Sequence, residues 1–189
     1  MKKVVLAALF AVSSPVFAQG YVGIGFGQSS ADLDPDPAPA GFSRTVNDTD
    51  TSFKVFGGAT VNENFGVEVG YIDFGELSVE YSDGSITASD NFALKTLYFA
   101  LVGNVPIGQA NIFAKVGMSS WDLDYSGRSN FGWSASASAS GTDPMFGIGV
   151  QFNVAEQVAI RAEFERYRLE DNGAKDDVDN LGIAAVIKF

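Results

Sequence analysis

The stretch Phe53–Gly75, "FKVFGGATVNENFGVEVGYIDFG", is the most informative part of this chain for its fold, because it alternates in residue type on both sides of a short polar segment. Val67 and Val69 are apolar, for example, while Glu68 between them is charged. Successive side chains of a β-strand point to opposite faces, so a period of two predicts strands. The polar segment "NEN" predicts a tight turn. We therefore expect a β-hairpin here.

The same alternation recurs along the chain, with short and long connections in turn. The short connections are "NEN", "VPIGQA" and "VAE". The expected strands lie at 20–28, 51–61, 65–75, 92–104, 111–122, 143–153, 157–168 and 180–189. In outer-membrane barrels the short turns face the periplasm and the long loops face the outside. The pattern therefore predicts an all-β fold: an eight-stranded antiparallel up-and-down transmembrane β-barrel with short periplasmic turns and long extracellular loops.

One face of the expected strands carries no charge, whereas the other is rich in glycine and carries balanced charges. An outward charge at the bilayer midplane costs roughly 2–4 kcal/mol, and a buried charge must be paired. The barrel of eight strands is just wide enough for side chains to fill it. We therefore expect an ion-pair network in a filled lumen, made of Lys54, Glu68, Lys115, Arg161, Glu163 and Glu165.

Some segments are not resolved by this pattern. The alternation alone also fits a soluble barrel with its apolar face inside. The fourth strand, "FALKTLYFALVG", is apolar on both faces and cannot be oriented. The stretch "WSASASASG" either extends two strands as a hairpin or forms a loop. Aromatic residues near the expected strand ends are interpreted as an interfacial girdle; these are Tyr71, Tyr98, Trp121 and Phe152.

The N-terminal segment has the features of a secretory signal peptide. Two lysines precede a short apolar run, and small residues end at Ala18. The run is too short for a spanning helix, which needs about 20 apolar residues. We expect cleavage after Ala18, a signal peptide at 1–18 and one barrel domain at 19–189. The protein is thus expected in the outer membrane of a Gram-negative bacterium.

Charge and composition exclude several functions. Two of the 12 basic residues lie in 1–18 and none of the 23 acidic ones do, so residues 19–189 carry a net charge of −13. This argues against nucleic acid as a partner. The chain has no histidine and no cysteine, which removes the usual general base and the thiol nucleophile. We therefore predict no enzyme activity, no cofactor and no metal site, and we interpret the acidic clusters as solvated loops.

Three segments resemble the small outer-membrane barrel proteins, such as the transmembrane domain of outer-membrane protein A. They are Phe53–Gly75, "VPIGQANIFAKVGMSSW" and "DPMFGIGVQFNVAEQVAIRAEF". The resemblance implies interior ion pairs, with Leu101 and Gln151 standing where the relative has an interior lysine and glutamate. It also implies that alternate apolar residues of the last strand form a signal for the outer-membrane assembly machinery; these are Leu181, Ile183, Ala185, Ile187 and Phe189.

Three functional hypotheses follow. The first is a non-catalytic integral outer-membrane barrel whose long acidic extracellular loops have a structural or surface-interaction role. The second is a narrow pore for ions or small solutes. The third is a soluble exported barrel that binds an apolar ligand inside. The expected partners are outer-membrane lipid, lipopolysaccharide and the assembly machinery, while any extracellular ligand is unknown.

Overall fold

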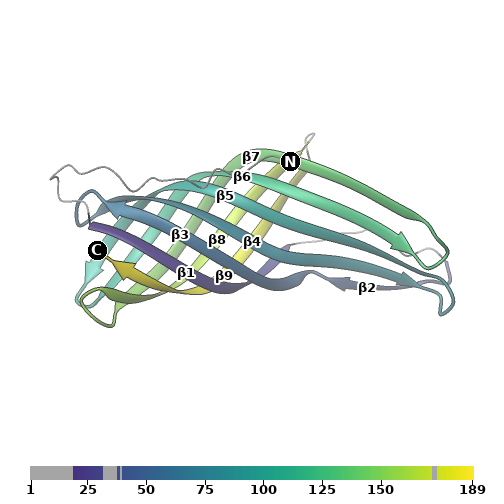
Figure 1. Cartoon of the computed structure of the whole chain (residues 1–189), viewed down its shortest axis with the longest axis horizontal. Helices are drawn as coiled ribbons and strands as arrows, with labels where there is room; N and C mark the ends of the chain where they lie inside the picture. The colour runs from purple at the N-terminus through teal and green to yellow at the C-terminus, as the bar shows by residue number, and fades with distance from the viewer. Residues whose placement is uncertain (1–18, 32–37, 39, 172–173) are drawn as a thin grey trace.

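The computed structural model describes residues 19–31, 38, 40–171 and 174–189, so the predicted signal peptide at 1–18 lies outside the described residues (Figure 1). No helix in the described part of the chain is long and apolar enough to cross a membrane. The described residues form nine strands: β1 (Gln19–Ala31), β2 (Ser43–Asn47), β3 (Thr49–Thr60), β4 (Phe65–Ser82), β5 (Thr87–Ile107), β6 (Ala110–Ser129), β7 (Ser134–Asn153), β8 (Val158–Asp171) and β9 (Ala174–Lys188).

Eight of these strands close into an antiparallel barrel, as predicted. Strand β1 pairs with β3 on one side and with β9 on the other, and β4 pairs with β5. Val22, for example, lies opposite Gly57 on β3 and Ile187 on β9. Strand β2 is additional and pairs with the end of β4. Closure leaves no edge at the level of the barrel, which is how strands can cross lipid.

The strands are longer than the sequence pattern indicated, and they use up most of the expected long connections. Strands β4 and β5 are joined by a turn at 83–86, and β6 and β7 by a turn at 130–133. The stretch "WSASASASG" thus extends the strands as a hairpin. The β7 extension, 134–142, contains only serine, alanine, glycine and threonine and has no apolar period. Its pairing with β6 therefore defines it as a strand, which periodicity could not reveal. The β4 extension does alternate, with Leu77 and Val79 buried between polar residues.

The extended strands form what we call the protruding sheet: residues 43–47, 76–82, 87–93, 123–129 and 134–142. Figure 1 shows β4, β5, β6 and β7 running well past the ends of β8 and β9. A bulge between Asp73 and Glu76, with Gly75 at a φ of 79°, marks where β4 leaves the barrel. The molecule therefore consists of a closed barrel and an open sheet made from the same strands.

The outward face of the barrel is an apolar belt. Ile24, Ile148 and Ile183 are 56%, 57% and 65% exposed. The belt ends at a charged row, where Lys95 lies opposite Asp73 on β4 and Asp122 on β6. Exposed apolar side chains in this continuous band fit lipid, so the hypothesis of a soluble barrel with an apolar interior is wrong.

The structure also orients β5. Tyr98 and Ala100 are buried inside the barrel, while Leu97, Phe99 and Leu101 are more than half exposed on the belt. Leu101 therefore faces outward and does not take the place of an interior lysine, contrary to the expectation from the resemblance. Strand β5 reads as apolar on both faces because its inward side chains pack in the lumen while its outward ones form the belt.

Candidate functional site

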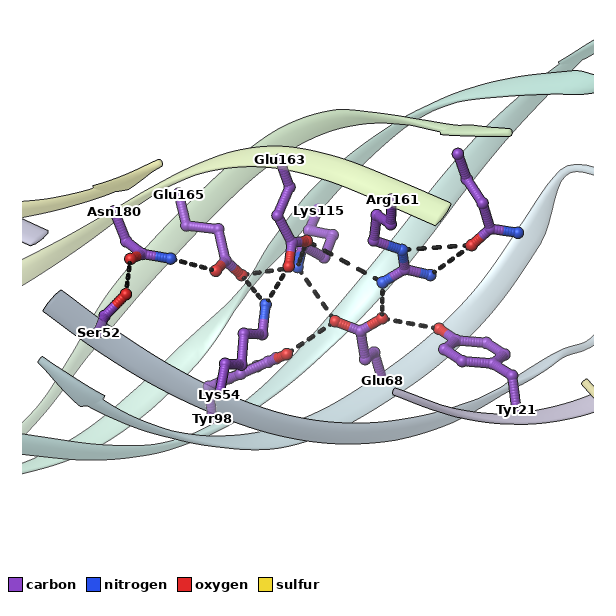
Figure 2. A network of polar contacts seen from close by, with 11 residues as sticks. Tyr21, Ser52, Lys54, Glu68, Tyr98, Lys115, Arg161, Glu163, Glu165 and Asn180 are labelled. Carbon is purple, nitrogen blue, oxygen red and sulfur yellow. Dashed lines mark hydrogen bonds and ion pairs between the residues drawn. The ribbon is translucent and has the colours of Figure 1, made fainter. Parts of the chain in front are cut away.

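The six predicted charged residues meet inside the barrel as one lumen network (Figure 2). Strands β3, β4 and β6 contribute one residue each and β8 contributes three, because alternate residues of β8 share the inward face. No side chain of the six is more than 5% exposed. In the structure these six residues face the lumen and pair with one another.

Lys115 is the centre of the network. Its Nζ atom lies 3.0 Å from Glu68 Oε1, 2.7 Å from Glu163 Oε2 and 2.6 Å from Glu165 Oε1. Lys54 lies on the other side of the same two glutamates, 2.6 Å from Glu163 Oε1 and 2.7 Å from Glu165 Oε1. The carboxylates of Glu163 and Glu165 are thus each shared between the ammonium groups of Lys54 and Lys115.

Arg161 links the network to an amide. Its Nη1 donates to Glu68 Oε2, while Nε and Nη2 donate to Gln151 Oε1 at 3.3 and 3.1 Å. Gln151 is therefore an interior residue, as the resemblance implied. The guanidinium also lies over the rings of Phe56 and Phe113, each with its centroid 4.7 Å from Cζ. Such stacking suits a planar cation that is shielded from water.

Four polar residues complete the network, and sequence reasoning missed all of them. Tyr21 and Tyr98 donate to Glu68 at 2.9 and 2.8 Å. Ser52 donates to Asn180, whose amide donates to Glu165 at 3.4 Å. Tyr21, Ser52 and Asn180 could have been found, because they share the inward parity of their strands.

Two of the predicted girdle residues are instead interior residues. Tyr98 and Trp121 are only 2% and 1% exposed, so their assignment to the membrane interface is wrong. Their rings fill space above glycines: a Cβ built on Gly70 would lie 2.6 Å from the ring of Tyr98, and one on Gly141 would lie 2.6 Å from that of Trp121. The inward glycines therefore make room for aromatic rings.

The network divides the lumen. A cavity of about 790 Å³ opens at the end with the tight turns, and its lining includes Asn62, Asn104 and Asn153. Arg161 and Gln151 also line this cavity, but Lys54, Glu163 and Glu165 do not. The cavity thus ends at the first layer of the network. Counted together with Arg161, the three cations and three anions of the network keep the dry interior neutral, as low dielectric requires.

The protruding sheet is a second candidate region. Trp121 Nε1 donates to Asp143 Oδ2 at 2.7 Å, and the Glu170 amide donates to the same oxygen at 3.1 Å. Asp143 thus ties β6, β7 and β8 together at the base of the sheet. Within the sheet, Tyr125 donates to Asp90 at 2.7 Å, and this bond raises the pKa of Tyr125 from its usual 10 to about 12.

Hydrogen bonds join the two turns at the tip of the sheet. Asn130 donates to the Ser85 carbonyl at 2.8 Å and accepts from the Thr87 amide at 3.1 Å, so it joins the two hairpin turns. The backbone amides of Ile86 and Ser85 donate to Asp83, which lowers the pKa of this carboxyl. Phe131 beside them is 68% exposed. The tip is therefore an ordered pair of turns with an exposed aromatic residue.

The predicted assembly residues all lie on the outward face of β9 or at its end. The side chains of Leu181, Ile183, Ala185, Ile187 and Phe189 are exposed. The backbone of Phe189 pairs with Gly20 through bonds of 3.0 and 2.9 Å, which closes the barrel at its last residue. Their role in assembly remains a prediction.

No described group of acidic, histidine or cysteine side chains could hold a metal ion. The acidic segment Asp32–Pro37 lies outside the described residues. In the acidic cluster formed by Asp176, Asp177 and Asp179, Asp179 accepts two hydrogen bonds from Arg166, at 2.6 and 2.7 Å, and Asp177 accepts one from Arg168 at 3.4 Å. This cluster therefore forms cross-strand ion pairs.

Solved structures of small barrels are similar to this chain in fold. Ail, the attachment invasion locus protein of Yersinia pestis, is 18% identical over 91% of this chain and 99% of its own, with a TM-score of 0.58. Neisserial surface protein A is 13% identical over 90% of this chain and 97% of its own, with a TM-score of 0.64. The N-terminal β-barrel domain of Pseudomonas aeruginosa OprF is 11% identical over 89% and 97%, with a TM-score of 0.52.

The sequence comparisons assign the family. No curated protein sequence matches this chain. A family model described as the outer membrane protein beta-barrel domain matches residues 4–189. This match spans the closed barrel, its apolar belt and the protruding sheet. The chain therefore belongs to the outer membrane protein beta-barrel domain family, whose members lie in the outer membrane of Gram-negative bacteria.

Proposed function

We propose that this protein is a non-catalytic outer-membrane barrel whose protruding sheet makes contacts at the cell surface. The observation that carries the proposal is the contrast between a lumen closed by ion pairs and a large polar sheet beyond the belt. Since tight turns face the periplasm in such barrels, the sheet lies outside the cell. Function resides where a rigid scaffold presents variable surface.

The lumen network acts as a static plug. Every one of its carboxylates is held by at least two donors, as Glu68 is by Lys115 and Arg161. A buried charge that loses its partner is strongly disfavoured. The network therefore resists opening and fixes the register of strands on opposite sides of the lumen.

The chemistry of the site does not favour catalysis. Glu163 and Glu165 are alternate residues of one strand, and both are bound by Lys54 and Lys115. A general acid or base needs a proton that it can exchange with a substrate. These carboxylates are instead held by permanent cations, and the chain contains no histidine or cysteine to replace them.

The charge of the sheet limits the class of partner. The protruding sheet with its turns, residues 43–47, 76–93 and 123–142, carries Arg44 and Arg128 against Glu76, Glu80, Asp83, Asp90 and Asp124. The related barrel Ail was crystallised with a heparin analogue, sucrose octasulfate. A sulfated polyanion would be repelled by the acidic sheet described above. We therefore expect partners that are neutral or basic.

The membrane partners follow from the belt. The apolar face contacts lipid, and the outermost charged row, with Lys95, lies at the level of lipid headgroups. We expect this row to meet lipopolysaccharide, and the last strand to be recognised by the assembly machinery. A leader at 1–18 that is cleaved after Ala18 would deliver the chain to that machinery.

A narrow pore is the second candidate, favoured by the open cavity of about 790 Å³ below Arg161. Planar-bilayer recording at defined salt separates it from the plug. Discrete openings that depend on Lys115 would support a pore. We expect none, because the network would have to break to let an ion through.

The test of the proposed function removes the β6–β7 part of the sheet and keeps the barrel. Residues 123–139 are replaced by a short turn between Asp122 and Ser140, which already face each other across β6 and β7. Faster migration of the unboiled protein in SDS confirms that the barrel is closed. Cells that express this shortened protein are then tested for adhesion to other cells and to coated surfaces. Adhesion should be lost; unchanged adhesion would contradict a role of the sheet.

A further inference from the structure

The outermost part of β7 is an open edge. Strand β7 pairs with β6 along its whole length, from Ser134 to Asn153, but pairs with β8 only from Met145 onward. Among the described residues, Ser134–Asp143 therefore have a strand on one side only. Alternate backbone N–H and C=O groups of an antiparallel edge strand point away from the sheet, so this edge offers a row of donors and acceptors.

Proteins usually protect such an edge, and this one lacks the usual protection. Common devices are lysine or other charges, proline, bulges and very short edge strands. Between Ser134 and Thr142 the residues are serine, alanine, glycine and threonine only. The first charge and the first proline are Asp143 and Pro144, where the pairing with β8 begins. The small side chains leave space for a strand to approach.

The sequence of the edge indicates which strand fits it. Residues 134–140 read "SASASAS", the same in both directions, with Ala137 at the centre. When two copies of a strand pair in antiparallel fashion about a two-fold axis, each residue faces its mirror position in the other copy. Ser134 would then face Ser140, and Ala137 would face Ala137. Serine meets serine on one face of the sheet and alanine meets alanine on the other.

The symmetry of this pairing also places the two barrels. The two-fold axis of an antiparallel strand pair is perpendicular to the sheet. The sheet continues the barrel wall, so its normal is roughly perpendicular to the barrel axis (Figure 1). Rotation by half a turn about that normal reverses the barrel axis. Two copies joined in this way would therefore stand in membranes that face each other, with their protruding sheets overlapping.

We propose that residues 134–140 of β7 pair with the same residues of a second copy in a facing membrane, so that the protein joins two cells. The proposal rests on the proposed function in one respect, since it needs the sheet to lie outside the cell. A single contact of this length is weak, because association has to overcome the loss of free motion of both partners. Many copies on each surface make the contact multivalent and hence durable.

The charges of the sheet predict how the contact responds to salt. The pairing edge itself is uncharged, whereas the sheet around it is acidic. Screening of like charges by salt therefore strengthens the contact. A contact through bridging divalent cations would instead require those cations and fail with a chelator.

The first experiment uses disulfide formation between copies. The chain has no cysteine, so an introduced cysteine can link only to another copy. Opposite Cα atoms in an antiparallel pair lie roughly 4.5–5.5 Å apart, within the range that a disulfide spans. Purified Ala137→Cys protein is folded into preformed vesicles, two vesicle samples are mixed, and a mild oxidant is added. Ala137→Cys should form covalent dimers.

The matched control is Ser134→Cys on the same strand. In the proposed register residue 134 faces residue 140, so Ser134→Cys alone should give at least about tenfold less dimer than Ala137→Cys, because its own copies lie beyond disulfide reach. Ser134→Cys vesicles mixed with Ser140→Cys vesicles should form the dimer again. Equal linking of Ser134→Cys and Ala137→Cys alone would overturn the proposed register.

The second experiment measures vesicle clustering by light scattering. Ser136→Asp with Ser138→Asp places charges on the edge and should abolish clustering, since these positions face each other. Ser89→Asp with Ser126→Asp adds the same charge to inner strands β5 and β6 and should leave clustering unchanged. Clustering that survives the edge charges, or that a chelator abolishes, would overturn the proposal. Adhesion to other surfaces could still be intact, so this outcome is separate from failure of the proposed function.

Discussion

The barrel and the protruding sheet are built from the same strands, but their side chains have different constraints. On β6, Lys115 lies in the lumen among three carboxylates, while Arg128 near the end of the same strand is exposed to water. In the barrel one face meets lipid and the other a dry lumen, so each side chain is specified by its surroundings. In the sheet, backbone pairing maintains the strands and a few side chains such as Leu77 and Val79 are buried, while the exposed side chains are free to vary.

This difference teaches where the chain tolerates change. Substitutions in the barrel should cost stability, whereas those in the sheet should alter contacts with partners and leave the fold intact. Matched pairs of variants, one in each region or at two positions of one region, test this difference between the barrel and the sheet.

The largest loss of stability is expected from Glu68→Ala. Glu68 accepts hydrogen bonds from Tyr21, Tyr98, Lys115 and Arg161, so its loss leaves buried cations without a partner. Breaking such a network costs about 3–5 kcal/mol. Urea unfolding of the refolded protein, followed by the mobility of unboiled samples in SDS, measures the loss.

The control for this variant is Glu80→Ala in the protruding sheet. Glu80 is exposed, and exposed positions change stability by about 0.5 kcal/mol or less. Equal unfolding midpoints for the two variants would show that the lumen network does not stabilise the barrel.

A charge on the lipid face should have the next largest effect. Ile148→Arg on β7 places a cation in the apolar belt, which costs about 2–4 kcal/mol near the bilayer midplane. Ser138→Arg on the same strand lies beyond the belt and should not change unfolding. The yield of refolding into vesicles and the midpoint of unfolding measure the effects of Ile148→Arg and Ser138→Arg. A stable Ile148→Arg protein would mean that the belt does not contact lipid at this height.

A smaller effect is expected where a glycine makes room for a ring. At Gly70, a Cβ would lie 2.6 Å from the ring of Tyr98, so Gly70→Ala should destabilise the barrel by about 1–3 kcal/mol through overpacking. At Gly103 a Cβ would have no neighbour within 4 Å. Gly103→Ala should therefore be nearly neutral in the same unfolding assay, and a greater loss at Gly103 would contradict this view of the packing.

The smallest effect concerns the pH response of the sheet. The hydrogen bond to Asp90 raises the pKa of Tyr125 from 10 to about 12. The raised value favours the protonated phenol in the folded state, so this stabilisation is present below pH 10 and is lost as the pH rises from 10 to 12. In Asp90→Asn protein, absorbance titration should show one tyrosine ionising closer to pH 10. An unchanged titration would show that Asp90 does not hold Tyr125.

Much of the barrel could be predicted because two environments impose one pattern. Residues such as Ile24 and Ile148 must face lipid and Glu68 must not, so the period of two identifies both faces. The pattern fails on β5, where both faces are apolar; the resemblance implied an interior Leu101, which the structure places on the outward face. It fails again on β7 above Asp143, where "SASASAS" has no apolar face to guide the assignment.

Which side chains share a face follows from the sequence alone, since alternation is a property of the extended backbone, and so does the balance of the inward charges. Which of these charges meet depends on the tertiary structure. Lys54 and Glu163 are 109 residues apart in sequence and lie on strands that are not neighbours in the barrel. They come together because closure brings opposite walls within the reach of two side chains. The free edge of β7 is likewise a tertiary feature, because β8 pairs with β7 only from Met145 onward.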